Sequence, residues 1–494
     1  MADQGICEDI QAGVNCSRLP NDLEPGVARR HAASERDVLL RRFRSRISPN
    51  AELNRQLVSF QANRQKPIYN WFRYKEGFSA EIVKHLIQAL PGQRTGILLD
   101  PFAGAGTAMF TGQSLGWSTI GIEVLPLGSA IGEARNIARL VDLERLRRAI
   151  EEAKSCNWGS FYDREFRFPH IPITERAFPE RSERALAGFS AYCARRVRDN
   201  MVRRLFLFAG MCVLEAISYT RKDGQYLRWD RRSGKNPHAG FDKGSILSFS
   251  EAISAKLESI YRDIAASRRC LFDEPEPRGS VGYHVGSCLE ILPTFPGGSV
   301  DLVLTSPPYC NRYDYTRTYA LELVWLGLND GQIKRLRQQM LCCTVENRDK
   351  TDSLNKLYHE FGKPEAFAHV YGVFRNQKAL HEVLRILEEY RSVGHLNNAN
   401  IPRMVCNYFL EMCFVIYELS RILRIGGKAV MVNDNVRYAG EEVPVDLILS
   451  SMAEEFGLTT KYIWILQRGK GNSSQQMGNH GRTELRKCVY IWEK

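Results

Sequence analysis

The sequence predicts an α/β fold whose parallel strands are interrupted by two large, mostly helical insertions. Two observations lead to this prediction. First, residues 96–123 read as strand, glycine-rich loop, helix, strand and terminal acid, which is the order of a βαβ unit. Second, strand and helix patterns alternate from about residue 95 to the end of the chain, and this alternation is broken twice.

The composition is that of a globular protein with a basic surface. Of the 494 residues, 44% are hydrophobic and 25% are charged, so more than one core, or one core with large insertions, is expected. A net charge of +12 favours a polyanionic partner such as nucleic acid, although a solvated basic surface would give the same count. None of the 13 cysteines has zinc-site spacing, so we expect reduced thiols in a cytoplasmic protein and no metal. We expect neither a signal peptide nor a membrane-spanning segment.

The first elements are predicted from polarity, capping and periodicity. Residues 1–60 are expected to form a basic N-terminal arm, which contains one short helix at 34–44. Ser79 is a good N-cap for the next helix. The apolar face of that helix is formed by Ile82, Val83, Leu86 and Ile87.

The remaining elements alternate around two regions without a sheet pattern. Residues 141–280 are rich in arginine, and residues 326–404 read as helices with polar loops. Both are interpreted as insertions, because the connections within an uninterrupted α/β sheet are short. Strands are expected at 96–99, 118–122, 282–285, 301–304, 428–432, 461–466 and 487–492, the last two helices at 408–423 and 445–456, and a turn at Gly426-Gly427.

The loop Asp100-Pro101-Phe102-Ala103-Gly104-Ala105-Gly106-Thr107 has the features of a nucleoside site. Gly104 and Gly106 allow the backbone to approach a ligand closely, and the helix that follows directs its free N–H groups toward it. Glu123, at the tip of the next strand, can accept hydrogen bonds from two ribose hydroxyls. The spacing lacks the third glycine of a dinucleotide site, which favours a nucleoside without a pyrophosphate, such as S-adenosylmethionine.

A second segment, Thr305-Ser306-Pro307-Pro308-Tyr309, follows the apolar strand. Proline has no N–H group and a fixed φ, so carbonyls in this segment remain free to accept hydrogen bonds from a ligand. A hydroxyl and a carbonyl suit an amine, and the tyrosine ring suits the face of a flat ring. An ordinary turn is the alternative interpretation of this segment taken alone.

Together, the two segments resemble the motifs of the amino-group DNA methyltransferases. The Ser-Pro-Pro-Tyr form is most similar to the N4-cytosine branch, whereas Asp-Pro-Pro and Asn-Pro-Pro forms are more typical of N6-adenine enzymes. Tyr74–Ser79 also resembles the segment that packs on the methionine end of the cofactor in this family. The predicted catalytic core comprises residues 61–140, 281–325 and 405–494, about half of the chain.

The resemblance implies a class I, Rossmann-like S-adenosylmethionine-dependent methyltransferase, with helices on both faces of a seven-stranded, mostly parallel sheet whose last strand is antiparallel. It also implies a target base flipped out of double-stranded DNA, because an amine inside the duplex cannot reach a sulfonium methyl group. Gly286-Ser287-Cys288 stand where the family often has Gly-Asp, so a hydroxyl would replace an acid beside the adenine of the cofactor. The cofactor-binding residues expected are Tyr74, Phe78, Ser79, Asp100, Phe102, Gly104, Gly106, Thr107, Glu123, Ser287, Cys288 and Thr305.

The catalytic residues expected are Ser306, Pro307, Pro308 and Tyr309. The Ser306 hydroxyl and the Pro307 carbonyl would orient the amine toward the methyl group, and Tyr309 would stack on the flipped base. No strong general base is required, because the proton can leave after the nitrogen becomes cationic. Cys310 is interpreted as a buried small hydrophobe, since the Pro-Cys order of carbon-5 enzymes is absent.

The insertion at 141–280 is the candidate target-recognition region. Basic and aromatic residues alternate between 221 and 235, as contacts to phosphates and bases require, although a basic surface hairpin without DNA contacts fits this stretch equally well. An amide-rich loop at 468–482 could line the groove or the base pocket. The DNA-binding residues expected are Arg221, Lys222, Arg228, Arg231, Arg232 and Arg482.

These residues predict a site-specific DNA methyltransferase for the N4 amine of cytosine. It would be the modification enzyme of a restriction–modification or defence system, with a cognate restriction endonuclease as its candidate partner. N6-methylation of adenine is the first alternative. Methylation of an amine in RNA or of a glutamine side chain is less favoured, because those enzymes usually carry Asn/Asp-Pro-Pro-Tyr. A basic, non-catalytic DNA-binding protein that retained the fold is the alternative of another class.

Overall fold

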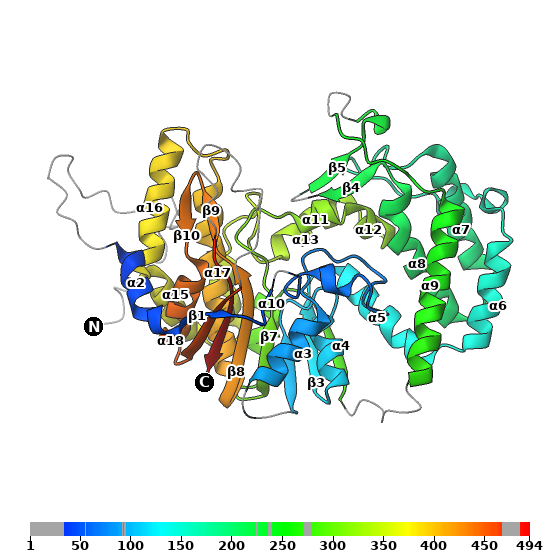
Figure 1. Ribbon diagram of the computed structural model, residues 1–494. Coiled ribbons are helices and arrows are strands. Elements are labelled where there is room, and N and C mark those ends of the chain that lie inside the picture. The colour runs from blue at the N-terminus through cyan, green and yellow to red at the C-terminus, as the bar shows by residue number, and fades with distance from the viewer. Residues whose placement is uncertain are drawn as a thin grey trace.

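The computed structural model describes residues 34–494 except 55, 91, 93–94, 224–225, 236–239, 271–278 and 467–484. An eight-stranded sheet forms its centre (Figure 1). In sheet order, the strands are β1 (Ile47–Asn50), β11 (Thr459–Leu466), β12 (Lys487–Glu493), β8 (Leu423–Asp434), β7 (Val300–Thr305), β2 (Ile97–Asp100), β3 (Ser118–Glu123) and β6 (Val281–Val285). The helices that pack on it include α3 (Ala80–Ala89), α4 (Thr107–Ser114), α5 (Pro126–Leu140), α17 (Ile401–Ile422) and α18 (Val445–Glu455).

The sheet is parallel except at β12. This strand runs antiparallel to both of its neighbours, β8 and β11, and the other neighbouring pairs are parallel. The predicted α/β fold with an antiparallel last strand is therefore confirmed. The sheet has one strand more than the expected seven, because β1 adds to the edge beside β11, with Ile47 opposite Ile463.

The segment before β1 belongs to the core and is not a free arm. Helix α2 (Glu35–Phe43) buries Leu39 and Phe43 in the hydrophobic cluster that also contains α17 and α18. Arg36 donates hydrogen bonds to Glu382 and Glu441, which lie far along the sequence. The arm expected at 1–60 is therefore too long, since α2 packs on α18 and β1 joins the sheet. Residues 1–33 lie outside the described residues.

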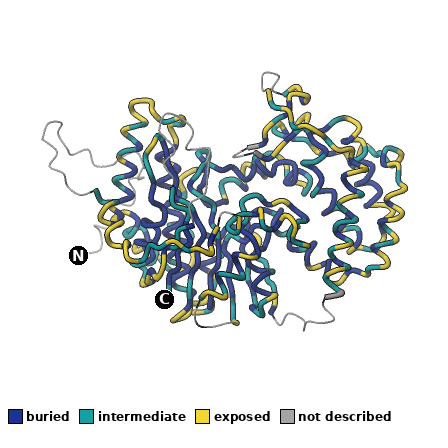
Figure 2. Tube along the Cα trace, viewed as in Figure 1, coloured by how far each residue is buried: buried dark blue, intermediate teal, exposed yellow. Residues whose placement is uncertain are grey.

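Successive residues of the central strands contribute to two separate cores. Leu98 of β2 and Leu302 of β7 pack in a cluster with α3, whereas their neighbours Leu99 and Val303 pack in the cluster with α17 and α18. Side chains alternate along a strand, so both faces of the sheet are covered, as a parallel sheet requires. Figure 2 shows the resulting band of buried residues through the centre of the molecule.

The first predicted insertion folds into a helical lobe with its own hydrophobic cluster, seen on the right of Figure 1. This cluster also takes in Trp71 and Tyr319 of the predicted catalytic core, so the lobe and the core share one packed interior. The lobe consists of α6 (Leu143–Lys154), α7 (Glu180–Arg195), α8 (Asn200–Ile217), the antiparallel hairpin of β4 (Thr220–Asp223) and β5 (Tyr226–Trp229), and α9 (Phe249–Cys270).

The second predicted insertion is divided between the two sides of the molecule. Its helices are α13 (Asp330–Gln339), α14 (Thr351–Glu360), α15 (Pro364–Arg375) and α16 (Lys378–Ser392), of which α15 and α16 contact α17. Helix α13 packs in the cluster of the first lobe, and α14, α15 and α16 pack in the cluster at the other end of the sheet. Helix α17 begins at Ile401, earlier than the expected 408, because Pro402 is tolerated in the first helical turn. It leads directly into β8, so Gly426 and Gly427 lie within that strand and not in a turn before it.

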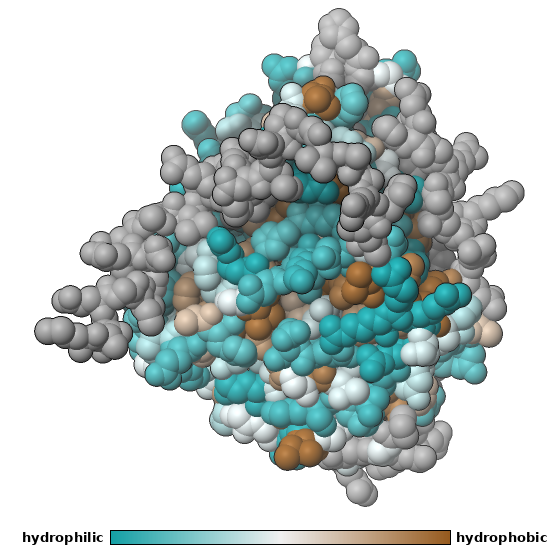
Figure 3. All heavy atoms as spheres, turned by 90° about the vertical axis from the view of Figure 1, so that its left-hand side faces the viewer, coloured by the Kyte–Doolittle hydropathy of each residue, from teal (hydrophilic) through white to brown (hydrophobic). Residues whose placement is uncertain are grey.

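One face of the molecule is mainly polar (Figure 3). Figure 3 shows one face on which hydrophilic side chains predominate and hydrophobic ones form small, separate groups. Among the described residues, none of the helices has the length and apolar character needed to cross a bilayer.

Replacing Phe43 by alanine should test whether α2 is part of the core. The Phe43 side chain is 0% exposed, so its removal should lower the free energy of unfolding by about 3–5 kcal/mol, measured by urea unfolding. Leu40→Ala, on the same helix but 38% exposed, is the matched control and should cost much less. Equal losses in the two variants would contradict the placement of α2.

Candidate active site

A pocket opens between β2 and β7, where the strand order reverses. The chain runs outward from β2 through β3 to β6, then returns to β7 and continues in the other direction to β8. Loops that leave such strands diverge and form a crevice at the carboxyl ends, where open α/β sheets bind ligands. The open space in the pocket, together with the solvent at its mouth, amounts to about 730 Å³. It is lined by predicted cofactor-binding residues Tyr74, Phe78, Asp100, Phe102, Gly104, Thr107, Glu123, Ser287 and Cys288, and by Ser306 and Pro308 of the predicted catalytic segment.

Three predicted cofactor-binding residues do not line this pocket. Ser79 is fully buried and caps α3: its hydroxyl accepts from the Ile82 N–H at 3.2 Å and donates to the Leu57 carbonyl at 2.6 Å. The expected cofactor contact of Ser79 is therefore not seen, because its side chain is 0% exposed and serves the fold as a helix cap. Gly106 has a φ of +72° at the start of α4, and a Cβ there would lie 2.4 Å from the Tyr283 hydroxyl oxygen. Gly106 shapes the loop without lining the pocket.

Thr305, the third, acts on the pocket through Asp100. Its hydroxyl donates to Asp100 Oδ1 at 2.6 Å, and the same oxygen accepts the Phe102 N–H at 3.1 Å. Burial raises the pKa of Asp100 to about 7, although these hydrogen bonds act in the opposite direction. Thr305 therefore orients a carboxylate at the end of β2 and is itself covered.

Glu123 closes the glycine-rich loop. Its carboxylate accepts the Gly104 N–H at 2.6 Å on one oxygen and the Leu125 N–H at 2.8 Å on the other. Burial raises the pKa of Glu123 to about 7. Each carboxylate oxygen has a second acceptor position, so Glu123 can still receive two hydroxyl donors from a ligand.

The pocket is acidic. Glu76, Asp100 and Glu123 line it, and no lysine or arginine occurs among its lining residues within the described part of the chain. Burial also raises the pKa of Glu76, so all three carboxyls are held in surroundings that disfavour their charge. A cationic ligand would relieve this cost, whereas a phosphate would increase it.

Part of the wall was not predicted from the sequence. Glu76 adjoins the recognised Tyr74, but nothing local distinguishes it from a surface acid. Tyr315 follows the Ser-Pro-Pro-Tyr segment, and residues 339–341 reach the pocket from the second insertion. Residues 339–341 carry no motif, so only the tertiary packing places them here.

The Ser-Pro-Pro-Tyr segment forms the side of the pocket after β7. Ser306 and Pro308 line it, Pro307 is buried and Tyr309 is half-buried. The Ser306 hydroxyl donates to the Tyr309 hydroxyl at 3.4 Å, which is long for two hydroxyls. The segment is held from behind, because the Tyr438 hydroxyl donates to the Cys310 carbonyl at 2.5 Å.

The Cys310 thiol is fully buried beside this segment. Burial raises the pKa of Cys310, and it also raises the pKa of Tyr309, so both groups stay protonated at neutral pH. Neither can act as an anionic nucleophile in this state.

The predicted DNA-binding residues differ in exposure. Arg221, Arg228 and Arg231 are exposed, and the Arg231 side chain retains 65% of its accessibility. Lys222 is only 3% exposed and pairs with Glu322 at 2.5 Å, so the prediction that it contacts DNA was wrong. Alternation along β4 turns Arg221 outward and Lys222 inward.

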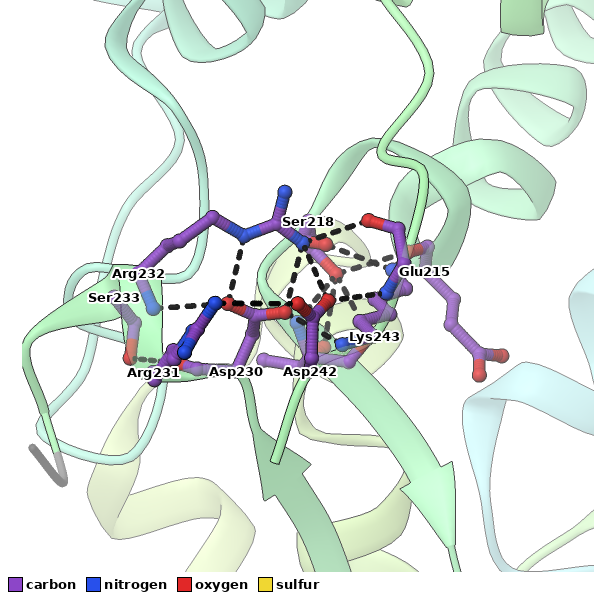
Figure 4. Close-up of polar contacts among 10 residues, drawn as sticks. Glu215, Ser218, Asp230, Arg231, Arg232, Ser233, Asp242 and Lys243 are labelled. Atoms are coloured by element: carbon purple, nitrogen blue, oxygen red, sulfur yellow. Dashed lines mark hydrogen bonds and ion pairs between the residues drawn. The ribbon is translucent and has the colours of Figure 1, made fainter. Parts of the chain in front are cut away.

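Arg232 is engaged by the loop that follows the hairpin (Figure 4). Its guanidinium donates to both oxygens of the buried Asp230 carboxylate at 2.8 Å, and these bonds hold the pKa of Asp230 well below its usual range. The Lys243 backbone N–H also donates to Asp230, while the Lys243 ammonium donates to carbonyls at the end of α8. The Arg232 guanidinium is therefore paired with a carboxylate of the protein, although its side chain is 43% exposed. Arg482 and the predicted loop at 468–482 fall in a stretch whose structure is not described.

Within the described ranges, no three His, Cys, Asp or Glu side chains are grouped so that they could hold a metal ion.

The chain is similar to known type II methyltransferases along nearly its whole length. It is 46% identical over 460 residues to type II methyltransferase M.AvaI of Nostoc sp. (strain PCC 7120), with 92% of each chain covered. The protein of the same name from Anabaena variabilis gives the same values. It is 39% identical over 504 residues to type II methyltransferase M.BsoBI of Geobacillus stearothermophilus, which covers 99% of this chain and 97% of the relative. No protein-family model and no solved structure matches the chain.

Glu123→Gln should change how stability depends on pH. The pKa of Glu123 is about 7 in the folded protein and about 4.3 in an unfolded chain, so the native state binds a proton that the unfolded state releases between these values. This group therefore makes the ligand-free wild type less stable as pH rises through that range. Relative to wild type, the variant should gain about 2 kcal/mol between pH 5.5 and 7.5 in urea unfolding.

The control for this prediction is Glu81→Gln. A hydrogen bond from Lys66 lowers the pKa of Glu81, which keeps it charged across the same pH window. The stability difference between this variant and wild type should therefore stay constant with pH. A constant difference for Glu123→Gln as well would contradict the raised pKa of Glu123.

Proposed function

The chain belongs to the type II DNA methyltransferases, and on that premise we propose that it transfers a methyl group from S-adenosylmethionine to the exocyclic N4 amine of cytosine in double-stranded DNA. One observation carries the proposal: Ser306 and Pro308 line the same pocket as Gly104 and Glu123. A nucleoside held by the glycine-rich loop would thus lie beside an amine held by the Ser-Pro-Pro-Tyr segment. The two halves of a methyl transfer would then share one enclosed space.

The residues of the pocket fit S-adenosylmethionine. The cofactor carries a sulfonium and an ammonium group against one carboxylate, and its net positive charge suits a pocket lined by three carboxyls. Glu123 would accept the ribose hydroxyls, and Ser287 with Cys288 would face the adenine. Tyr74 and Phe78 would pack on the methionine part. When bound, the cofactor supplies an electrophilic methyl group.

The Ser-Pro-Pro-Tyr segment would hold the target amine. The long hydrogen bond of the Ser306 hydroxyl, 3.4 Å, is weak and leaves this group ready to contact the amine. The Pro307 carbonyl would accept the second hydrogen bond, and the half-buried, neutral ring of Tyr309 would stack on the flipped base. Positioning would supply most of the rate enhancement.

Serine at the first position of this segment supports cytosine over adenine, by the resemblance to the N4-cytosine branch. In a restriction–modification system, the enzyme would protect the sites that a cognate endonuclease cleaves. The described cysteines form no disulfide, in keeping with the proposed cytoplasmic location.

The test of this proposal is to sequence DNA from cells that express the protein, with a method that separates N4-methylcytosine from N6-methyladenine. N4-methylcytosine at one recurring sequence is the expected result. N6-methyladenine would overturn the choice of base, and unmodified DNA together with no cofactor binding in calorimetry would favour a non-catalytic DNA-binding protein.

Ser306→Ala and Tyr309→Ala should each lower the methyl-transfer rate by at least about 100-fold, because the amine loses its orientation. Cofactor binding, measured by calorimetry, should be largely retained. Tyr309→Phe keeps the ring and should keep most of the activity. A near wild-type rate for Tyr309→Ala would refute the stacking role.

Arg221→Ala should weaken DNA binding for all sequences alike and reduce the slope of log K against log salt by about 0.9. Arg385→Ala is the matched control, because Arg385 is an exposed arginine on α16 in the second insertion. Its salt slope should equal that of wild type. An unchanged slope for Arg221→Ala would mean that the hairpin makes no phosphate contact at this residue.

A further inference from the structure

The two strands of the β4–β5 hairpin carry cations on both of their faces. Arg221 lies opposite Arg228, and Lys222 lies opposite Leu227. The arginines are exposed, whereas Lys222 and Leu227 are buried. The outer face therefore presents Arg221 and Arg228 as candidate DNA contacts. The inner face directs Lys222, the residue after Arg221, into the interior of the protein.

The Lys222 ammonium is held by groups from three other segments. It lies 2.5 Å from Glu322 Oε1 and 3.9 Å from Glu215 Oε2. It also lies 4.8 Å from the ring centroids of both Phe72 and Tyr319, which is within range of a cation–π interaction. Phe72 precedes α3, Glu215 belongs to α8, and Tyr319 and Glu322 follow the Ser-Pro-Pro-Tyr segment. A movement of the hairpin would therefore change the contacts of Lys222 with all three segments.

Tyr319 carries this contact to the pocket. Its ring stacks on that of Tyr74, with centroids 5.2 Å apart and planes 10° apart. Its hydroxyl donates to Glu76 at 2.6 Å. Tyr74 and Glu76 both line the pocket, and a Cβ at Gly104 would lie 3.1 Å from the Tyr74 ring. The position of Tyr319 thus fixes one wall of the pocket against the glycine-rich loop.

Stability alone does not explain the buried ion pair. Lys222 and Glu322 are 3% and 1% exposed, and Glu322 Oε2 has no hydrogen-bond partner among the described residues. The free energy needed to remove two charges from water is larger than the free energy that a surface ion pair contributes. Apolar residues of similar size in the same place often give equal or greater stability. Such a pair does, however, fix the relative position of the segments that carry it.

We propose that Lys222 is a positioning residue, through which DNA contact on the outer face of the hairpin is coupled to cofactor binding in the pocket. This inference rests on the proposed function. DNA bound by the hairpin would fix the position of Lys222. Lys222 would in turn fix the position of the stacked Tyr319 and Tyr74 rings, which form part of the pocket wall. Linkage then requires DNA and cofactor to raise each other's affinity by the same factor.

The experiment measures this coupling factor in the full chain. The dissociation constant of S-adenosylhomocysteine, which cannot be turned over, is determined by calorimetry with and without a saturating duplex that contains the methylated sequence. For wild type, the two constants should differ by about fivefold or more. For Lys222→Met combined with Glu322→Gln, which removes both charges of the buried pair, the ratio should fall to within about twofold of one.

The matched control is Arg424→Met combined with Asp301→Asn. It removes another ion pair with a buried carboxylate, 2.8 Å long, at the opposite end of β7. It should lower stability but keep the wild-type coupling factor, which separates a positioning role from a general loss of structure. An unchanged factor in the Lys222/Glu322 variant, or no coupling in a wild type that binds both ligands, would overturn this inference alone. A wild type that binds neither S-adenosylmethionine nor S-adenosylhomocysteine would overturn the proposed function and the inference together.

Discussion

The hydrogen bond from Thr305 Oγ1 to Asp100 Oδ1 is the contact on which the rest of the site depends. It is 2.6 Å long and buried, and it joins the ends of β7 and β2, the two strands between which the sheet order reverses. The loop after β2 forms the glycine-rich side of the pocket, and the segment after β7 forms the Ser-Pro-Pro-Tyr side. Because the strand ends are tied together, the distance between a ligand on one side and a ligand on the other is set by the sheet and not by the loops.

The features that the sequence predicted correctly have local patterns. Buried strands such as β2 and β7 are short apolar runs. Each ends at a segment whose glycines or prolines mark a change in backbone conformation from strand to loop. β1 was missed because Ile47–Asn50 is short and contains Pro49, which is tolerated at the sheet edge and acquires its partner only when β11 is in place. Ser79 shows the opposite error: its cap was recognised, but a second role was added to a hydroxyl that the cap already uses.

The features that could not be predicted arise from packing between distant segments. Glu76 is positioned by a hydrogen bond from the Tyr319 hydroxyl, which lies 243 residues later in the sequence. Residues 339–341 line the pocket but belong to an insertion that carries no motif. The basic run 221–235 is continuous in the sequence and predicts a DNA contact at Lys222, whereas the hairpin divides this run between an outer and an inner face. A sequence pattern gives the alternation along a strand, but the direction of that alternation depends on what the strand packs against.

The acidity of the pocket affects how strongly the cofactor and the product of the proposed reaction are held. Burial raises the pKa of Glu76, Asp100 and Glu123, and the two that adjoin the glycine-rich loop titrate near 7. A cationic cofactor lowers the cost of charging these groups, so it should be held best when they are ionised. Methyl transfer removes the sulfonium charge, after which the same burial again favours their protonation. The product keeps its ammonium group but carries no net positive charge, so the acidic pocket attracts it less strongly than it attracts the cofactor. On the proposed function, the pocket distinguishes cofactor from product by charge as well as by shape, and the carboxyls that attract the first also favour release of the second.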